Sequence, residues 1–403
     1  MLNDYQHGRI LMVLESVFPI NGGVERQVKT LSKYFASIGF NMQIVVPMVS
    51  YGPRNRMDIV DGVPVHRIAY PKIKILGGVL MLLNLAIYLI KNRGSYDVIH
   101  VHIAHHMAAV CCVIGRFLQK PVIVKVTGLR EMEQGVLAKG QSNLIIKGLR
   151  WALHKASYYQ AISKQIANLL RSFGFDNRKI YCIPNAIDIT RFSHTGDAQH
   201  PLPKLSGSAS LVGLYVGRLV PEKGLELLIN AWSQAFSVED DVYLLIVGDG
   251  ELRAQLEALV RNHQRDHQII FCGISDHVES YLRIADFGIL ASVYEGLSNA
   301  LLEYMAAGLP VLGSRISGTE DVVLENETGW LFTSGDQSEL VACLKYVKQM
   351  NKEELRIIGA KARRWIGDYA GLESISVRLL ELYGLDTNGP KVQPLANLKI
   401  RAS

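Results

Sequence analysis

The sequence contains few cysteines, no hydrophobic run long enough to cross a bilayer and no short internal repeat. Its 403 residues include only 5 cysteines, an odd number with no C-x-x-C pair. This count excludes a disulfide framework and argues against a zinc site, so we expect reduced thiols in a cytoplasmic protein. The chain starts MLNDYQHGRILMVLES, a polar lead before a strand-length apolar run, which is not typical of a signal peptide. The absence of repeats excludes a solenoid.

Composition indicates a folded globular chain of two or three domains, with 49% hydrophobic and 20% charged residues. The net charge of +6 conceals an asymmetry. Residues 1–190 carry 23 Lys and Arg against 10 Asp and Glu, whereas residues 191–403 carry 20 against 27. A basic half of +13 and an acidic half of −7 indicate either two units with different partners or excess charge scattered over solvated surface.

Apolar strands alternate with amphipathic helices in both halves of the chain. In the first half we expect strands at 9–16, 41–47, 97–102, 121–128 and 179–188, a hairpin at 61–68, and helices at 24–39 and 160–174. In the second half we expect strands at 211–218, 242–250, 269–273, 286–292 and 310–314, with helices at 224–236, 251–263 and 277–285. This alternation predicts an α/β fold with two doubly wound parallel sheets.

A polar stretch rich in Gly, Pro and Ser separates the two halves. The predicted organisation is a domain at residues 1–192, a linker at 193–210, a second domain at 211–385 and a tail at 386–403. The last helix is a candidate to pack back on the first domain. Ligands of such sheets bind at the carboxyl ends of the strands, so we expect the functional cleft between the two domains.

The segment YEGLSNALLEYMAAGLPVLG places two carboxylates, Glu295 and Glu303, around the start of a helix. Ser298 is the expected N-cap, with its hydroxyl accepting from a first-turn amide, and Gly308 is expected to end the helix. Free amides and the positive end of the helix dipole suit a phosphate, while the carboxylates suit hydroxyl groups. A nucleotide sugar carries both kinds of group.

Three further loops follow predicted strands. Arg218 and Lys223 lie between a strand and a helix, where two cations can neutralise a diphosphate, or where they can simply be solvated. In VGDG, Gly248 either approaches a ligand closely or forms an ordinary tight turn. Gly22 and Gly23 precede a helix after the first strand, which is a weak phosphate signal on its own.

Together these segments resemble the retaining glycosyltransferases of family four, which have the GT-B fold. The resemblance covers about residues 9–385. It rests on the E-x7-E pair, the GR-x4-KG loop, VGDG, the N-terminal GG-x2-R and the SGTED and NETGWLF segments, in that family's order. It implies two Rossmann-like domains facing each other across a cleft, the first binding the acceptor and the second holding the sugar donor.

The resemblance also implies roles for individual residues. Arg218 and Lys223 would hold the donor diphosphate and Glu295 the hydroxyls of the transferred sugar, which makes these three the catalytic candidates. Glu303 would bind the ribose, Gly23 the distal phosphate, and the Gly273–Ile274 backbone the base. The remaining donor-side candidates are Gly22, Gly248, Gly296, Leu297 and Ser298, and the acceptor-side candidates are Arg26, Thr127, Gly128 and Asn185.

The implied reaction is transfer of a sugar from a nucleoside diphosphate to an acceptor hydroxyl with retention, in cell-surface polysaccharide or glycolipid synthesis. UDP-sugars are favoured over GDP-mannose as donors. The acceptor is a saccharide or a lipid-linked saccharide, and we expect no nucleic-acid partner. The family is metal-independent, and the D-x-D motif of the other glycosyltransferase fold is absent here. We therefore expect no metal or other cofactor.

Three positions depart from the family pattern. Thr127-Gly128 replaces a His-Gly or His-Asp, Asn185-Ala186 replaces Asn-Gly, and Ala291-Ser292 replaces Pro-Ser. The first departure lies near the reacting sugar. It leaves open a non-catalytic nucleotide-sugar-binding protein, and a GT-B epimerase or phosphorylase is the other alternative.

Two more features have competing interpretations. The histidines of the 97–106 segment can be read as a metal cluster, but imidazoles at a strand end usually have a structural role; they are His100, His102, His105 and His106. The apolar run from Leu76 to Ile90 would span only about 22 Å as a helix, too short for a bilayer of about 30 Å. It is expected to be a core helix or, flanked by lysines and arginines, a segment at an anionic membrane surface, which would make the protein peripheral on the inner membrane face.

Overall fold

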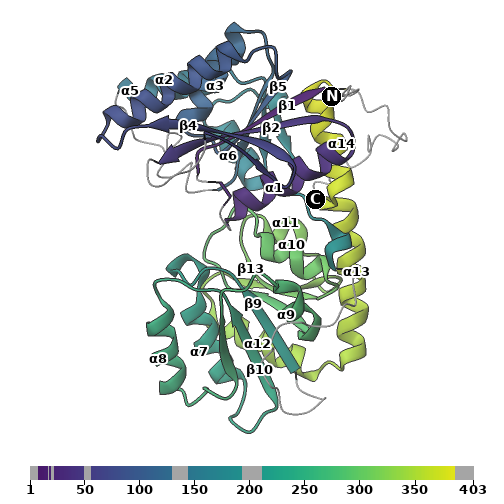
Figure 1. Cartoon of the computed structure of the whole chain (residues 1–403). Coiled ribbons are helices and arrows are strands. Elements are labelled where there is room, and N and C mark those ends of the chain that lie inside the picture. Colours follow the sequence, from purple (N-terminus) through teal and green to yellow (C-terminus); the bar gives the residue numbers. More distant parts are fainter. Residues whose placement is uncertain are drawn as a thin grey trace.

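The computed structural model describes residues 8–16, 18–19, 22–49, 56–128, 144–192 and 211–385. The predicted linker 193–210 and tail 386–403 lie outside the described residues. The chain forms two α/β units stacked one above the other, each with a central sheet between helices (Figure 1). The predicted fold class of two doubly wound domains is confirmed.

The first sheet has the order β3-β4-β2-β1-β5-β6-β7-β8. Its strand pairs are parallel except for the β3–β4 hairpin, whose turn residues Asp61 and Gly62 both have positive φ. Its central strands β5 and β6 are buried along their whole length, which explains their unbroken apolar sequences. The strands are β1 (Arg9–Leu14), β2 (Asn41–Val49), β3 (Met57–Val60), β4 (Val63–Tyr70), β5 (Val98–His102), β6 (Val122–Val126), β7 (Tyr158–Ala161) and β8 (Ile180–Cys182).

The second sheet is parallel throughout, with the order β11-β10-β9-β12-β13-β14. In both sheets the strand order reverses direction once, between β1 and β5 and between β9 and β12. Such switch points open a crevice at the carboxyl ends of the strands. The strands are β9 (Leu211–Val216), β10 (Val242–Val247), β11 (Ile269–Gly273), β12 (Phe287–Leu290), β13 (Val311–Arg315) and β14 (Gly329–Thr333).

Helices cover both faces of the first sheet. Helices α2, α3 and α5 pack side by side on one face, whereas α1 shares an apolar cluster with the last helix, α14, on the other (Figure 1). The helices of this unit are α1 (Gly23–Ser37), α2 (Leu76–Lys91), α3 (His106–Phe117), α5 (Leu144–Leu153) and α6 (Lys164–Ser172). Those of the second part of the chain are α7 (Leu225–Ala235), α8 (Arg253–Asn262), α9 (Val278–Ile284), α10 (Asn299–Ala306), α11 (Thr319–Val322), α12 (Gln337–Gln349), α13 (Lys352–Ala370) and α14 (Leu372–Tyr383).

One helix begins later in the structure than the sequence predicts. Residues 160–174 read as a single amphipathic helix, but Gln160 and Ala161 end strand β7 and the helix α6 starts only at Lys164. The break is set by Ser163, whose extended backbone and side chain cap the helix by accepting from the Ile166 amide. Ser163 is a typical N-cap residue and could have marked the boundary in the sequence. The short strand before it was not separated from the helix because its residues fit the same amphipathic pattern.

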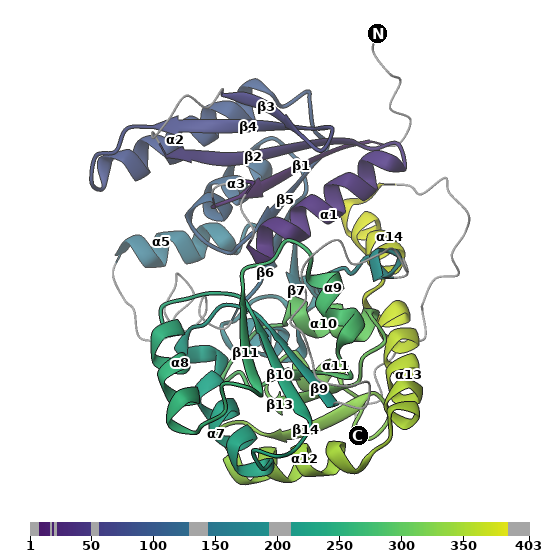
Figure 2. The ribbon, with the colours of Figure 1, turned by 60° about the horizontal axis from the view of Figure 1, so that its bottom comes forward.

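The last helix connects the two units. Helix α13 packs on the second unit, and after Gly371 the chain continues as α14 against the first unit, as Figures 1 and 2 both show. The Tyr383 hydroxyl lies 2.6 Å from Nδ1 of His100 in β5, and Arg378 donates to the carbonyl of Cys182 in β8. The C-terminal helix therefore belongs to the core of the N-terminal unit.

We expect Leu379→Ala in α14 to destabilise the N-terminal unit by about 2–5 kcal/mol, because Leu379 is fully buried there. The control is Ile357→Ala in α13, where the side chain is 52% exposed. Urea unfolding followed by circular dichroism measures both variants. Equal stability of the two would show that α14 does not support the first unit.

Candidate functional site

A cavity of about 670 Å³ lies between the two units and is lined by residues of both. On the second unit its walls come from the segments that follow β9 and β12, the strands on either side of the switch point. On the first unit they come from the start of α1 and from the end of β6. The cavity thus occupies the position at which parallel α/β sheets bind ligands.

The predicted acidic helix is α10, and its surroundings position both carboxylates. Ser298 is the N-cap residue, as expected, but its side chain makes no capping hydrogen bond. That detail of the prediction is wrong, so a first-turn amide expected to be capped lacks that side-chain partner. Gly308 has φ of +80° just after the helix, a conformation that favours glycine.

Lys223 and Glu295 form the central ion pair of the cavity. Lys223 Nζ lies 2.5 Å from Oε1 of Glu295, and both side chains are largely shielded, with 14% and 20% exposure. The Ser292 hydroxyl lies 3.2 Å from the other oxygen of the Glu295 carboxylate and orients it. Arg218 stands nearby with 72% of its side chain exposed, and its nearest carboxylate, Glu222, is 3.9 Å away. An exposed guanidinium and a shielded, ion-paired ammonium therefore line the cavity.

Glycines bring the backbone of three loops together around these cations. Gly224 has φ of +64°, and a Cβ there would lie 2.0 Å from the carbonyl oxygen of Ala291, so only glycine lets the Lys223 loop pack on the Glu295 loop. Gly248 has φ of +141°, and its Cβ would lie 1.9 Å from the carbonyl oxygen of Gly217. The VGDG motif is therefore needed for loop packing, and Gly248 also lines the cavity.

Glu303 is nearly buried, with 7% side-chain exposure, and faces Arg26 of helix α1 at 3.4 Å. Burial raises the pKa of Glu303, and the charge of Arg26 only partly offsets that effect. This contact joins the acidic helix to the first unit. Arg26, which was predicted to lie on the acceptor side, therefore contacts Glu303, which was predicted to bind the donor.

The first unit contributes an amide-rich edge to the cavity. Gly23, the first residue of α1, lies beside the side chain of Asn299, which donates to its carbonyl at 3.1 Å. Asn185 in turn donates to Asn299 at 2.9 Å, and Gln27 bonds with Ala186. The start of a 15-residue helix therefore faces the cations across the cavity.

Most of the predicted site residues line this cavity. They are Gly23, Arg26, Thr127, Asn185, Arg218, Lys223, Gly248, Ile274, Glu295, Leu297, Ser298 and Glu303. Four predicted glycines are not among the lining residues but precede or follow one that is; they are Gly22, Gly128, Gly273 and Gly296. Gly296 instead packs between the units, where a Cβ would lie 2.3 Å from the carbonyl oxygen of Thr127.

The cavity also contains residues that the sequence did not reveal. Gln27 and Asn299 are polar residues on helices and carry no motif. Lys125 is 1% exposed within the apolar strand β6 and lines the cavity floor. A lysine inside the run VIVKV was a usable signal, because lysine is almost never fully buried without a partner.

The four histidines separate into two pairs. His100 and His102 are fully buried in β5, and burial lowers the pKa of His100 to about 3, so its ring is neutral. His100 bonds with Tyr383, whereas the ring nitrogens of His102 have no hydrogen-bond partner among the described residues. The structural interpretation therefore fits His100, while His105 and His106 lie beyond the strand end, beside Glu15.

Sequence comparisons decide the family. The profile for "Glycosyltransferase Family 4" matches residues 21–191, and the profile for "Glycosyl transferases group 1" matches residues 205–365. The chain is a family 4 glycosyltransferase. The resemblance noted from the motifs is thereby confirmed, and this glycosyltransferase has the GT-B fold that the two facing sheets display.

Relatives of this glycosyltransferase act on different substrates. It is 26% identical over 297 residues to N-acetyl-alpha-D-glucosaminyl L-malate synthase of Bacillus anthracis, covering 73% of this chain and 76% of the relative. It is also 26% identical over 306 residues to the Escherichia coli UDP-Gal:alpha-D-GlcNAc-diphosphoundecaprenol alpha-1,3-galactosyltransferase, covering 70% and 73%. Anabaena HepE in complex with UDP shares the fold, with a TM-score of 0.73 at 17% identity over 93% of this chain and 99% of HepE.

The buried carboxyl of Glu303 predicts a pH-dependent stability difference. Because the folded-state pKa of Glu303 is raised, its ionisation costs stability once the pH rises above its ordinary value of 4.5. We expect Glu303→Gln, without ligand, to be as stable as the wild-type protein near pH 4 and more stable at pH 8. Thermal unfolding across this range measures the difference. A variant that is less stable at pH 8 would contradict it.

Proposed function

We propose that this glycosyltransferase moves a sugar from a nucleoside-diphosphate sugar to an acceptor hydroxyl with retention at the anomeric carbon. UDP-sugars are the favoured donors over GDP-mannose, and the acceptor is a saccharide or a lipid-linked saccharide of a cell-surface polymer or glycolipid. One observation carries the proposal. Two cations and two carboxylates converge on one cavity at the switch point, opposite the positive end of α1.

The relatives support the donor and acceptor classes. The galactosyltransferase relative is named for a UDP-sugar donor and a diphosphoundecaprenol-linked acceptor. HepE binds UDP within the same fold. These names concern other proteins, so for this chain UDP and a lipid-linked acceptor remain our proposal.

In this proposal the cations stabilise the leaving group. Arg218 and Lys223 would bind the diphosphate as its bond to the sugar breaks, assisted by the amides at Gly23. Binding of the diphosphate would draw Lys223 from Glu295, which leaves that carboxylate to accept hydrogen bonds from the sugar hydroxyls. Glu303 would hold the ribose. No metal is needed in this scheme, because the positive charge comes from side chains and a helix start.

Retention would follow from attack on the face from which the diphosphate leaves. The departing phosphate oxygen would then accept the proton of the acceptor hydroxyl, so that no separate general base is required. The protein contributes alignment, since both units surround the reacting groups and hold them in one cavity. The bond between the sugar and the donor phosphate breaks, and the glycosidic bond to the acceptor oxygen forms. The acceptor proton moves to the released phosphate, so no further reactant is required.

Lys223→Ala and Glu295→Ala test the assignment. We expect each to reduce sugar transfer by about 10²–10³-fold, because each removes a preorganised charge from the reacting centre. The control is Val293→Ala, an exposed residue of the same loop. Donor consumption is measured by mass spectrometry with UDP- and GDP-sugars. Undiminished transfer by both variants would refute the proposed roles.

The same assay, together with a thermal-shift measurement of UDP binding, separates the alternatives. A nucleotide-sugar-binding protein would show a thermal shift with UDP but no turnover with any acceptor. An epimerase would change the donor without an acceptor, and a phosphorylase would require inorganic phosphate.

We also propose that the first unit rests on an anionic membrane surface, where a lipid-linked acceptor would be found. Among the described residues, no helix is long and apolar enough to cross a bilayer. Helix α2 nevertheless has two apolar faces. Its buried stripe is Gly77, Met81, Leu85 and Leu89, and its exposed stripe is Leu76, Val79, Leu83, Ile87 and Ile90. The expectation of a core helix therefore describes only one side of α2.

The neighbouring helices also carry exposed apolar side chains. Helix α3 packs beside α2, and α5 packs beside α3. These two helices carry the exposed side chains Phe117, Leu144, Ile145 and Trp151. The segments 72–93, 106–120 and 144–155, which contain the three helices, hold nine lysines and arginines and no acidic residue. Apolar side chains surrounded by cations suit the interface of an anionic bilayer, and the cations set the preference for anionic lipid.

Flotation with vesicles tests this surface. We expect the full-length protein to float with phosphatidylglycerol vesicles and not with phosphatidylcholine vesicles. Leu83→Glu with Ile87→Glu should abolish flotation, whereas Val238→Glu, at an exposed apolar residue of the second unit, should not. Each cation removed should weaken binding about fivefold. A wild-type protein that stays unbound, while still consuming donor, would refute the membrane proposal alone.

A further inference from the structure

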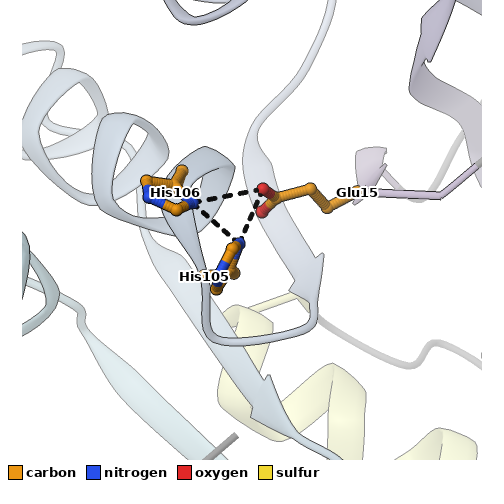
Figure 3. A group of neighbouring side chains, drawn as sticks. All are labelled: Glu15, His105 and His106. Atoms are coloured by element: carbon orange, nitrogen blue, oxygen red, sulfur yellow. Dashed lines mark hydrogen bonds and ion pairs between the residues drawn. The ribbon is translucent and has the colours of Figure 1, made fainter. Parts of the chain in front are cut away.

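A second cluster of ligating side chains lies outside the cavity, at the switch point of the first sheet. Glu15 follows the end of β1, His105 lies between the end of β5 and α3, and His106 is the first residue of α3. In Figure 3 the two imidazoles and the carboxylate point toward one another from these elements. None of the three lines the cavity between the units.

The three atoms approach one another closely. His105 Nδ1 lies 2.8 Å from Glu15 Oε1 and 2.8 Å from His106 Nδ1, and His106 Nδ1 lies 3.6 Å from the same oxygen. A neutral imidazole carries one N–H, so the His105 proton cannot fully satisfy both neighbours. A metal ion would accept a lone pair from all three atoms at once.

The spacing is close to that of a metal site. Ligand atoms about 2.0–2.1 Å from a tetrahedral zinc ion lie about 3.3 Å apart, within the range seen here. Glu15 directs Oε1 at both imidazoles. Its other oxygen accepts from the Met107 amide, which fixes the carboxylate at the start of α3.

We propose that Glu15, His105 and His106 bind one divalent transition-metal ion of the zinc class. Two imidazoles and one carboxylate are the donor set that zinc prefers over magnesium or calcium. Both histidine side chains are 39% exposed, so the fourth position is open to solvent or to an anionic ligand. The ion would fasten the start of the β1–α1 connection, which leads to Gly22 and Gly23, to helix α3.

The site is separate from the chemistry proposed above, in which sugar transfer needs no metal. Its position on the first unit, the proposed acceptor side, makes phosphate or carboxylate groups of an acceptor the natural fourth ligand. Metal binding can be measured without donor or acceptor, so the outcome does not depend on the proposed transfer reaction.

Titration of the chelator-treated full-length protein with Zn²⁺ and Co²⁺ tests the site. We expect one ion per chain by calorimetry and visible d–d absorption of bound Co²⁺, with no binding of Mg²⁺. His105→Ala with His106→Ala should weaken Zn²⁺ binding at least about 100-fold. Glu15→Gln, which keeps the shape and an amide oxygen for the Met107 contact, should weaken it at least about tenfold. The control is His263→Ala, at an exposed histidine of the second unit.

Near-ultraviolet circular dichroism verifies that each variant is folded. If the double variant does not fold, Glu15→Gln alone decides. Absence of one-to-one binding in the wild-type protein would overturn the proposal and leave the cluster as a hydrogen-bonded triad. Binding that persists unchanged in the variants would equally overturn it, because the ion would then lie elsewhere.

Discussion

The opposition of two parallel sheets by their carboxyl edges is the constraint on which the rest of the structure depends. Each sheet reverses strand order once, and each reversal opens a crevice at that edge. The crevice of the second sheet holds the pair of Lys223 and Glu295, and the start of α1 closes it from the other side. The cations come from the second unit and the start of α1 from the first, so a diphosphate held between them requires both units.

Contacts between the two units hold the carboxyl edges of the two sheets opposite each other. An apolar cluster runs without interruption from the first sheet into helix α10 of the second unit. Around it, Arg26 meets Glu303, the hydroxyls of Ser163 and Ser317 lie 2.7 Å apart, and Gly296 packs on Thr127. Helix α14 adds a covalent connection by returning to the first unit. Packing between the units therefore requires glycine at position 296.

Most of the fold and of the candidate site could be predicted from the sequence, because the patterns that indicate them lie within short segments of the chain. Strand and helix periods indicated the two sheets, and the motif loops indicated the charged residues. What it could not supply depends on distant segments. Arg26 faces Glu303 across 277 positions, and the Ser298 hydroxyl makes no cap although its identity suggests one. Apolar residues of α2 read alike in sequence, and only their packing separates the buried stripe from the exposed stripe.

Helix α3 connects the proposed metal cluster of the first unit with its proposed membrane surface. It begins at His106, beside the switch point, and ends at the exposed Phe117 of the proposed membrane surface. Its twelve residues span about 18 Å, which is the distance along α3 between the proposed metal cluster and the proposed membrane surface. An acceptor that extends from that surface along α3 would meet the proposed ion at Glu15, His105 and His106, which lie outside the cavity, so the ion would bind the acceptor away from the reacting bond.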